Sequence, residues 1–136
     1  MALKWREDLA VGINKIDQQH KELFERTDQL LNACNLGKGR EEVAKLIDFL
    51  LEYVVTHFKD EEQYQKKYGY PDYDNHKMLH DKFIDEVKNL KNKLDSEGSS
   101  IGLVIEINRK VIDWLVNHIG KVDRQLATFL KSKNVV

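Results

Sequence analysis

The chain contains little cysteine and little proline, and each shortage argues against a class of fold. It carries one cysteine, Cys34, so no disulfide within the chain can hold the fold together. It carries one proline, Pro71, whereas strand-rich folds usually contain more residues that favour turns. The sequence therefore argues against a disulfide scaffold and against an all-β architecture.

An excess of charge and a long apolar run are also lacking. The 22 basic and 23 acidic residues leave a net charge of −1, with no basic stripe of the kind that binds nucleic acid. No apolar run approaches the roughly 20 residues of a membrane span, and residues 1–8 lack the apolar core of a secretory signal. We therefore expect a soluble, cytoplasmic monomer that binds neither nucleic acid nor membranes.

What the chain does have is apolar residues that recur every three or four positions, the pattern of helices with one buried face. Its length predicts one domain, residues 1–136. The alternation of Leu9, Val11 and Ile13 suits an extended arm that lies on apolar surface. The expected elements are an arm at 1–16 and helices at about 17–36, 40–68, 74–96 and 100–131.

Polar residues that favour helix starts precede three of these stretches, and the connections between them are short. The expected N-caps are Asp17, then Asp72 or Asp74, then Ser99 or Ser100. Short connections make consecutive helices antiparallel neighbours. The predicted fold is all-α: an up-down-up-down antiparallel four-helix bundle with an extended N-terminal arm.

The histidines all fall on the expected buried faces. A buried imidazole without a partner costs roughly several kcal/mol. A single histidine on an apolar face is more often a core residue with a hydrogen-bond partner, but one buried metal site accounts for all of them together. The antiparallel topology brings them to the same end of the bundle, beside Glu61 and Asp123. The five histidines are His20, His57, His76, His80 and His118.

Spacing along the helices supports a shared site. His57 precedes Glu61 by four residues, so both lie on one face of a helix, and the same holds for the two histidines of the third helix. His118 and Asp123 are five apart, which on a straight α-helix separates their directions by about 140°. We therefore predict a kink, or an end to regular α-helix, between His118 and Asp123.

The donor set indicates which metal is bound. Five imidazoles and two carboxylates exceed the four donors of a tetrahedral zinc site. Imidazole and carboxylate without thiolate suit iron, and open positions on such iron are typical of oxygen chemistry. Two six-coordinate irons, bridged by Glu61, Asp123 and one solvent-derived group and bound by the five imidazoles, keep one open position. One open position suits a small diatomic ligand.

In the order and spacing of these seven residues the sequence resembles the hemerythrins, most of all their single-domain bacterial form, the bacteriohemerythrins. The likeness extends from about residue 5 to 129 and includes the surrounding segments 11–13, 16–24, 57–62, 69–71 and 114–119. It implies an oxo- or hydroxo-bridged pair of non-haem irons that binds dioxygen reversibly, with an oxygen-consuming enzyme as the recipient. It assigns His76, His80 and His118 to one iron, His20 and His57 to the other, and Glu61 and Asp123 to both.

The resemblance also implies an apolar pocket around the gas. Leu115 resembles the residue that guards bound oxygen in relatives, and further apolar residues lie near the ligands. Many bacterial relatives carry a methionine shortly after the Glu-Glu pair, whereas residues 63–65 here are Gln-Tyr-Gln. This departure affects the pocket wall or a ligand path, and Tyr64 is either a core aromatic or a hydrogen-bond donor near the site. The expected pocket residues are Leu115, Phe24, Phe58 and Ile119.

The balance of donors favours oxygen carriage over catalysis. Oxygen-activating di-iron enzymes built on bundles are rich in carboxylates, whereas here five histidines accompany two carboxylates. We therefore expect an oxygen-binding protein for storage, transport or delivery, with at most weak peroxidase-like activity. The alternatives are an oxygen or redox sensor module, and a di-iron peroxidase or a protein that detoxifies nitric oxide or iron.

Overall fold

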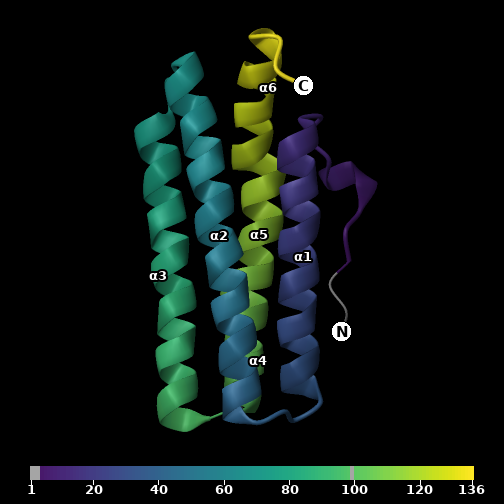
Figure 1. Cartoon of the computed structure of the whole chain (residues 1–136), viewed down its shortest axis with the longest axis vertical. Helices are drawn as coiled ribbons and strands as arrows, with labels where there is room; N and C mark the ends of the chain where they lie inside the picture. The colour runs from purple at the N-terminus through teal and green to yellow at the C-terminus, as the bar shows by residue number, and fades with distance from the viewer. Residues whose placement is uncertain (1–3, 99) are drawn as a thin grey trace.

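The computed structural model describes residues 4–98 and 100–136, and in these residues every regular element is helical. Four antiparallel rods stand side by side, as predicted (Figure 1). Three rods are single helices: α1 (Asn14–Asn35), α2 (Arg40–Tyr68) and α3 (Tyr73–Glu97). The fourth rod consists of α4 (Ile101–Ile107), η2 (Asn108–Ile112), α5 (Asp113–Asn117), η3 (His118–Asp123) and α6 (Arg124–Ser132).

The start of α1 differs from the prediction, because Asp17 is not its N-cap. The helix begins at Asn14, and the Asp17 carboxylate reaches back to accept the backbone N–H groups of Val11 (2.8 Å) and Gly12 (3.1 Å). Asp17 thus ties the arm to the first turn of the helix. The arm contains a short 3₁₀ turn, η1 (Glu7–Leu9), and the expected alternation holds, because Leu9, Val11 and Ile13 are buried. Residues 1–3 of the expected arm lie outside the described part of the chain.

Two of the other helix ends follow the expected chemistry, and a third, at Asp72, follows it in position only. Gly69 ends α2 with a φ of 70°, a left-handed conformation that glycine adopts without strain. Asp72 occupies the N-cap position of α3, but its carboxylate accepts from the Asn75 side chain rather than from the helix backbone. Ser100 caps α4 as predicted, because its hydroxyl oxygen accepts the N–H of Leu103.

The fourth rod is not a regular α-helix. Its two interruptions, η2 and η3, are π-helical, and η3 spans His118–Asp123, where the spacing predicted a distortion. Because the π form pairs each residue with the fifth one along, it brings side chains five apart towards the same side of the rod. The prediction for His118 and Asp123 is confirmed. The interruption at η2 was not predicted; there the Asn108 side chain bonds the carbonyl of Val104 and competes with the helix backbone.

The apolar core consists of two clusters with the polar residues between them. The large cluster contains residues from all four rods, among them Leu23, Phe58, Phe83 and Ile119. A smaller one lies near the arm and is made of Val11, Ile13, Ile16, Leu126, Ala127 and Leu130. The antiparallel order of the rods therefore leaves one layer of buried polar side chains between two apolar ones. Within the described residues, no helix is long and apolar enough to cross a membrane.

Candidate metal centre

The seven predicted donors meet in the layer between the two clusters, and each is at most 5% exposed. Their oxygen and nitrogen atoms form two groups, within each of which the donor atoms lie no more than 4.8 Å apart. Both groups contain Glu61 and Asp123. The first adds His20 and His57, and the second adds His76, His80 and His118. This grouping is the one that the resemblance implies.

The Glu61 carboxylate divides its two oxygens between the groups. Its Oε2 lies 3.6 Å from Nε2 of His20 and 3.3 Å from Nε2 of His57. Its Oε1 lies 3.6 Å from Nε2 of His76 and 3.2 Å from Nε2 of His80. One carboxylate thus offers one oxygen to each group, which is how a carboxylate bridges two metals.

Asp123 divides its oxygens in the same way. Its Oδ2 lies 3.1 Å from Nε2 of His20, whereas its Oδ1 lies 3.1 Å from Nε2 of His76 and 3.2 Å from Nε2 of His118. The π-helical turn of η3 allows Asp123 to face inward on the same rod as His118. A second carboxylate therefore spans the same two groups.

The hydrogen-bonding state of these atoms fits a metal. Both carboxylate oxygens of Glu61 and both ring nitrogens of His20 are buried without a hydrogen-bond partner among the described residues. The Nε2 atoms of His76 and His118 lie 3.1 Å apart, and two imidazole nitrogens point at each other only with a shared proton or cation between them. Buried polar atoms are normally satisfied, and imidazole and carboxylate donors without thiolate suit iron. The residues present therefore fit a pair of metal ions.

Further polar residues hold two of the imidazoles from outside. The Gln19 side-chain carbonyl lies 2.7 Å from Nδ1 of His57, and the Gln19 amide donates to Asp60, which also faces Lys15. Nδ1 of His80 lies 3.0 Å from the Glu62 carboxylate. Such partners fix the orientation of a metal-binding imidazole and direct its other nitrogen inward.

These outer residues were not singled out from the sequence, although a signal exists. Gln19 lies three residues after Ile16 and four before Leu23, so it follows the same buried-face spacing that identified the histidines. Tyr64 packs against the smaller apolar cluster, as expected of a core aromatic. Tyr64 is half-buried, and its neighbour Gln65 is fully buried, because it follows Glu61 by one full turn.

Aromatic rings pack against the imidazoles on the side of the large cluster. Phe58 stacks on His80 with ring centroids 3.8 Å apart, and Trp114 stacks on His118 at 4.2 Å. The four residues predicted to form the apolar pocket are each at most 2% exposed and belong to the large cluster. The donors thus lie beside a dry apolar wall. The four are Leu115, Phe24, Phe58 and Ile119.

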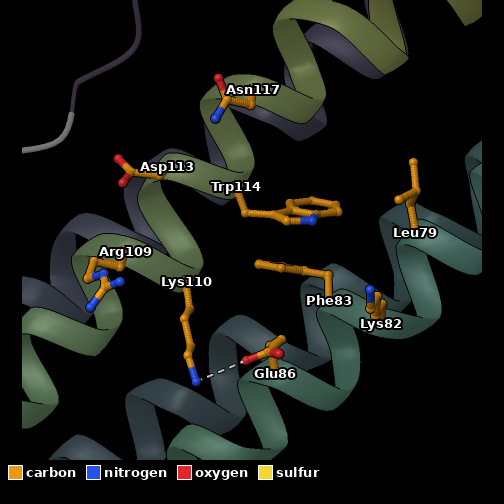
Figure 2. A pocket seen from close by; sticks show the side chains of 9 residues that line it. All are labelled: Leu79, Lys82, Phe83, Glu86, Arg109, Lys110, Asp113, Trp114 and Asn117. Atoms are coloured by element: carbon orange, nitrogen blue, oxygen red, sulfur yellow. Dashed lines mark ion pairs between the residues drawn. The ribbon is translucent and has the colours of Figure 1, made fainter.

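A surface pocket of about 440 Å³ lies between α3 and the fourth rod, outside this wall (Figure 2). Trp114 and Phe83 point into it from opposite rods, with their rings stacked 4.0 Å apart. Its rim carries charges of both signs, including an ion pair between Lys110 and Glu86. Trp114 separates this pocket from His118, so the pocket is not part of the metal centre.

Burial and opposite charge compete at the titratable groups of the centre. Burial opposes a charge on His20, but the carboxylates of Asp123 and Glu61 outweigh it and raise the His20 pKa to about 9. The pKa of His80 is raised to about 9 in the same way, by Glu61 and Glu62. Burial also opposes ionisation of Glu61 and Asp123, but the facing imidazoles hold both carboxyl pKa values well below their ordinary range.

These shifts predict how the stability of the apoprotein depends on pH. The raised pKa values of His20 and His80 contribute stability that is complete below about pH 6.5 and is lost as the pH rises towards 9. The free energy of unfolding should therefore fall by up to about 1.4 kcal/mol per pH unit for each histidine. Urea unfolding of the apoprotein at pH 6 and pH 8 measures this. An equal or higher midpoint at pH 8 would contradict the charged state of these imidazoles.

Comparison with known families identifies the arrangement. The family model described as "Hemerythrin HHE cation binding domain" matches residues 11–130, which include all seven donors. The chain belongs to the hemerythrin family. It is 37% identical over 117 residues to a bacteriohemerythrin of Methylococcus capsulatus, covering 86% of this chain and 87% of that protein. It is 36% identical to a hemerythrin-like protein of Naegleria gruberi, covering 88% of this chain and 86% of that one.

Solved structures show the same fold for this member of the hemerythrin family. A crystal structure of wild-type hemerythrin superposes with a TM-score of 0.84 at 34% identity, covering 96% of this chain and 98% of that one. A hemerythrin mutant with a leucine replaced by tyrosine superposes equally well at 36% identity, with the same coverage. The predicted family and the predicted bundle are both confirmed.

Proposed function

We propose that this chain binds dioxygen reversibly at a pair of iron ions held by His20, His57, Glu61, His76, His80, His118 and Asp123. The observation that carries the proposal is the division of the carboxylate oxygens, since Glu61 and Asp123 each offer one oxygen to each imidazole group. When bound, two ferrous ions supply the electrons that dioxygen takes up. The matching family model is described as a cation-binding domain, and membership of the hemerythrin family supports iron as the metal and dioxygen as the ligand.

The two groups differ in how many imidazoles they contain. Three imidazoles belong to the α3 and fourth-rod group, whereas only His20 and His57, from α1 and α2, belong to the other. Because both groups share the same carboxylates, the group with His20 and His57 has one donor fewer. We infer that the gas binds on the side of His20 and His57.

The chain's own contribution is to position the donors and to exclude water and protons. Gln19 and Glu62 hold two imidazoles with Nε2 directed inward. The residues on the cluster side are apolar and buried. A site that excludes water limits side reactions such as proton leakage. These features support release of unchanged dioxygen rather than its further reduction, and hence storage, transport or delivery to an oxygen-consuming enzyme.

The lifetime of the oxygenated form separates carriage from catalysis. The chain is reconstituted with ferrous iron under argon, exposed to oxygen and then returned to argon, while its visible spectrum is recorded. We expect an oxygenated spectrum that lasts for minutes and reverses under argon. Immediate conversion to the diferric form, with turnover of an added reductant, would instead favour a peroxidase or a detoxifying protein.

Replacing Leu115 by alanine is expected to shorten the lifetime of the oxygenated form. Leu115 is 1% exposed and precedes His118 by three residues, so its loss opens the apolar wall to water beside the metals. The substitution should also cost about 2–5 kcal/mol of folding stability. Autoxidation followed by visible absorbance measures the lifetime.

The control for Leu115→Ala is Leu94→Ala. Leu94 is equally buried, but it lies on α3 fourteen residues beyond His80. Leu94→Ala should lose similar stability and keep the oxygenated form. If both variants autoxidise equally fast, loosened packing in general, and not the wall beside the metals, sets the lifetime.

A further inference from the structure

Gln65 is a buried polar residue that the proposed ligand set does not use. Its side chain is fully buried, and neither its amide nitrogen nor its carbonyl oxygen has a hydrogen-bond partner among the described residues. An unsatisfied buried polar group costs about 1–3 kcal/mol. An apolar side chain of similar size would avoid that cost, so the amide requires an explanation.

The position of Gln65 places it next to the metal centre. It follows Glu61 by four residues on α2, and helical side chains lean towards the N-terminal end, over the preceding turn. Its backbone carbonyl accepts the N–H of Tyr70 (2.8 Å), and the Tyr70 ring lies 6.3 Å from the ring of His76. Gln65 therefore lies in the layer of the donors, near Glu61 and His76.

Metal binding creates a need for hydrogen-bond acceptors in this layer. A neutral imidazole that binds a metal through Nε2 carries its proton on Nδ1, and that N–H usually donates to a carboxylate, a carbonyl or water. Gln19 and Glu62 meet this need for His57 and His80. Nδ1 of His76 and Nδ1 of His20, in contrast, are buried without partners among the described residues. Of these two imidazoles, His76 is the one that Tyr70 places beside Gln65.

We propose that Gln65 is a positioning residue of the metal centre, whose side-chain carbonyl accepts the Nδ1–H of His76 once a metal holds Nε2 of that ring. The inference rests on the proposed metal centre, but not on reversible oxygen binding. It accounts for two of the three orphaned atoms of Gln65 and His76, because the side-chain carbonyl oxygen of Gln65 would accept and Nδ1–H of His76 would donate. In the metal-free chain the unsatisfied amide of Gln65 lowers the stability of the fold. In the metal-loaded chain its carbonyl oxygen would orient the imidazole of His76.

The test compares Gln65→Met with the matched control Gln63→Met, using ferrous iron alone under argon. Gln63 is exposed on the same helix, so its replacement should change neither stability nor iron binding appreciably. Gln65→Met should raise the melting temperature of the apoprotein, because it removes the orphaned amide. The same variant should weaken iron binding by about 10–100-fold, the usual effect of losing an outer partner of a ligand. If Gln65 had only a structural role, its replacement would change the melting temperatures of the metal-free and the iron-loaded chain by the same amount.

A second variant tests the acceptor role itself. Gln65→Glu keeps an oxygen that accepts the Nδ1–H of His76, so it should retain iron affinity within a few-fold of the original chain. Unchanged iron affinity in Gln65→Met would overturn the proposal, and so would a Gln65→Glu variant that binds iron as poorly as Gln65→Met. If the original chain itself binds no iron, the proposed metal centre fails instead, and the two failures are thereby distinguished.

Discussion

Glu61→Ala is expected to reduce the iron content from about two ions per chain to near zero, because a shared bridging ligand serves both metals. Glu61 belongs to both donor groups, with one oxygen facing each. His118→Ala removes a donor from one group only and should leave about one ion per chain. Iron is measured by elemental analysis after anaerobic reconstitution and desalting, with circular dichroism to verify that each variant is folded.

Glu62→Ala is the matched control for Glu61→Ala. Glu62 is the next residue of α2, but its carboxylate reaches only the outer Nδ1 of His80. Its loss should weaken iron binding by about 10–100-fold without removing a ligand, so that the stoichiometry at saturating iron stays at two. A Glu61→Ala chain that retains its full iron content would contradict the bridging role.

Ferrous iron is expected to raise the melting temperature of the chain by roughly 30 °C. Each site contributes about 4 kcal/mol when free metal is a thousandfold above its dissociation constant, and 1 kcal/mol shifts the midpoint by about 4 °C in a domain of this size. The metals also relieve the unsatisfied oxygens of Glu61 and the opposed nitrogens of His76 and His118. Calorimetry under argon, with and without iron, measures the shift.

The three variants above make this stability test specific. His118→Ala should show about half of the iron-dependent rise, and Glu61→Ala should show almost none, whereas Glu62→Ala should approach the original chain at saturating iron. A rise that is the same in all four proteins would mean that iron stabilises the chain somewhere other than at these donors.

Periodicity along each helix was enough to predict which residues meet. The histidines stand where apolar side chains are expected, and the antiparallel order of the rods carries them into one layer. The interval of five between His118 and Asp123 even predicted the distortion of η3. These features depend on spacing within one helix, and spacing is visible in the sequence.

What could not be predicted depends on contacts between elements. Asp17 binds the arm instead of capping α1, because the chain before it folds back towards its carboxylate. The bond from Gln19 to His57 depends on how α1 is rotated against α2, which periodicity leaves free. The full burial of Gln65, in contrast, follows from its spacing of four residues after Glu61, a signal that lies within one helix.

The most direct test is anomalous X-ray scattering at the iron absorption edge from crystals of the iron-loaded chain. The central claim is that two carboxylates each join two sets of imidazoles. We predict two anomalous peaks, one beside His20 and His57 and the other among His76, His80 and His118, with Glu61 and Asp123 in contact with both. A single peak, or peaks away from the layer between the two apolar clusters, would contradict the account.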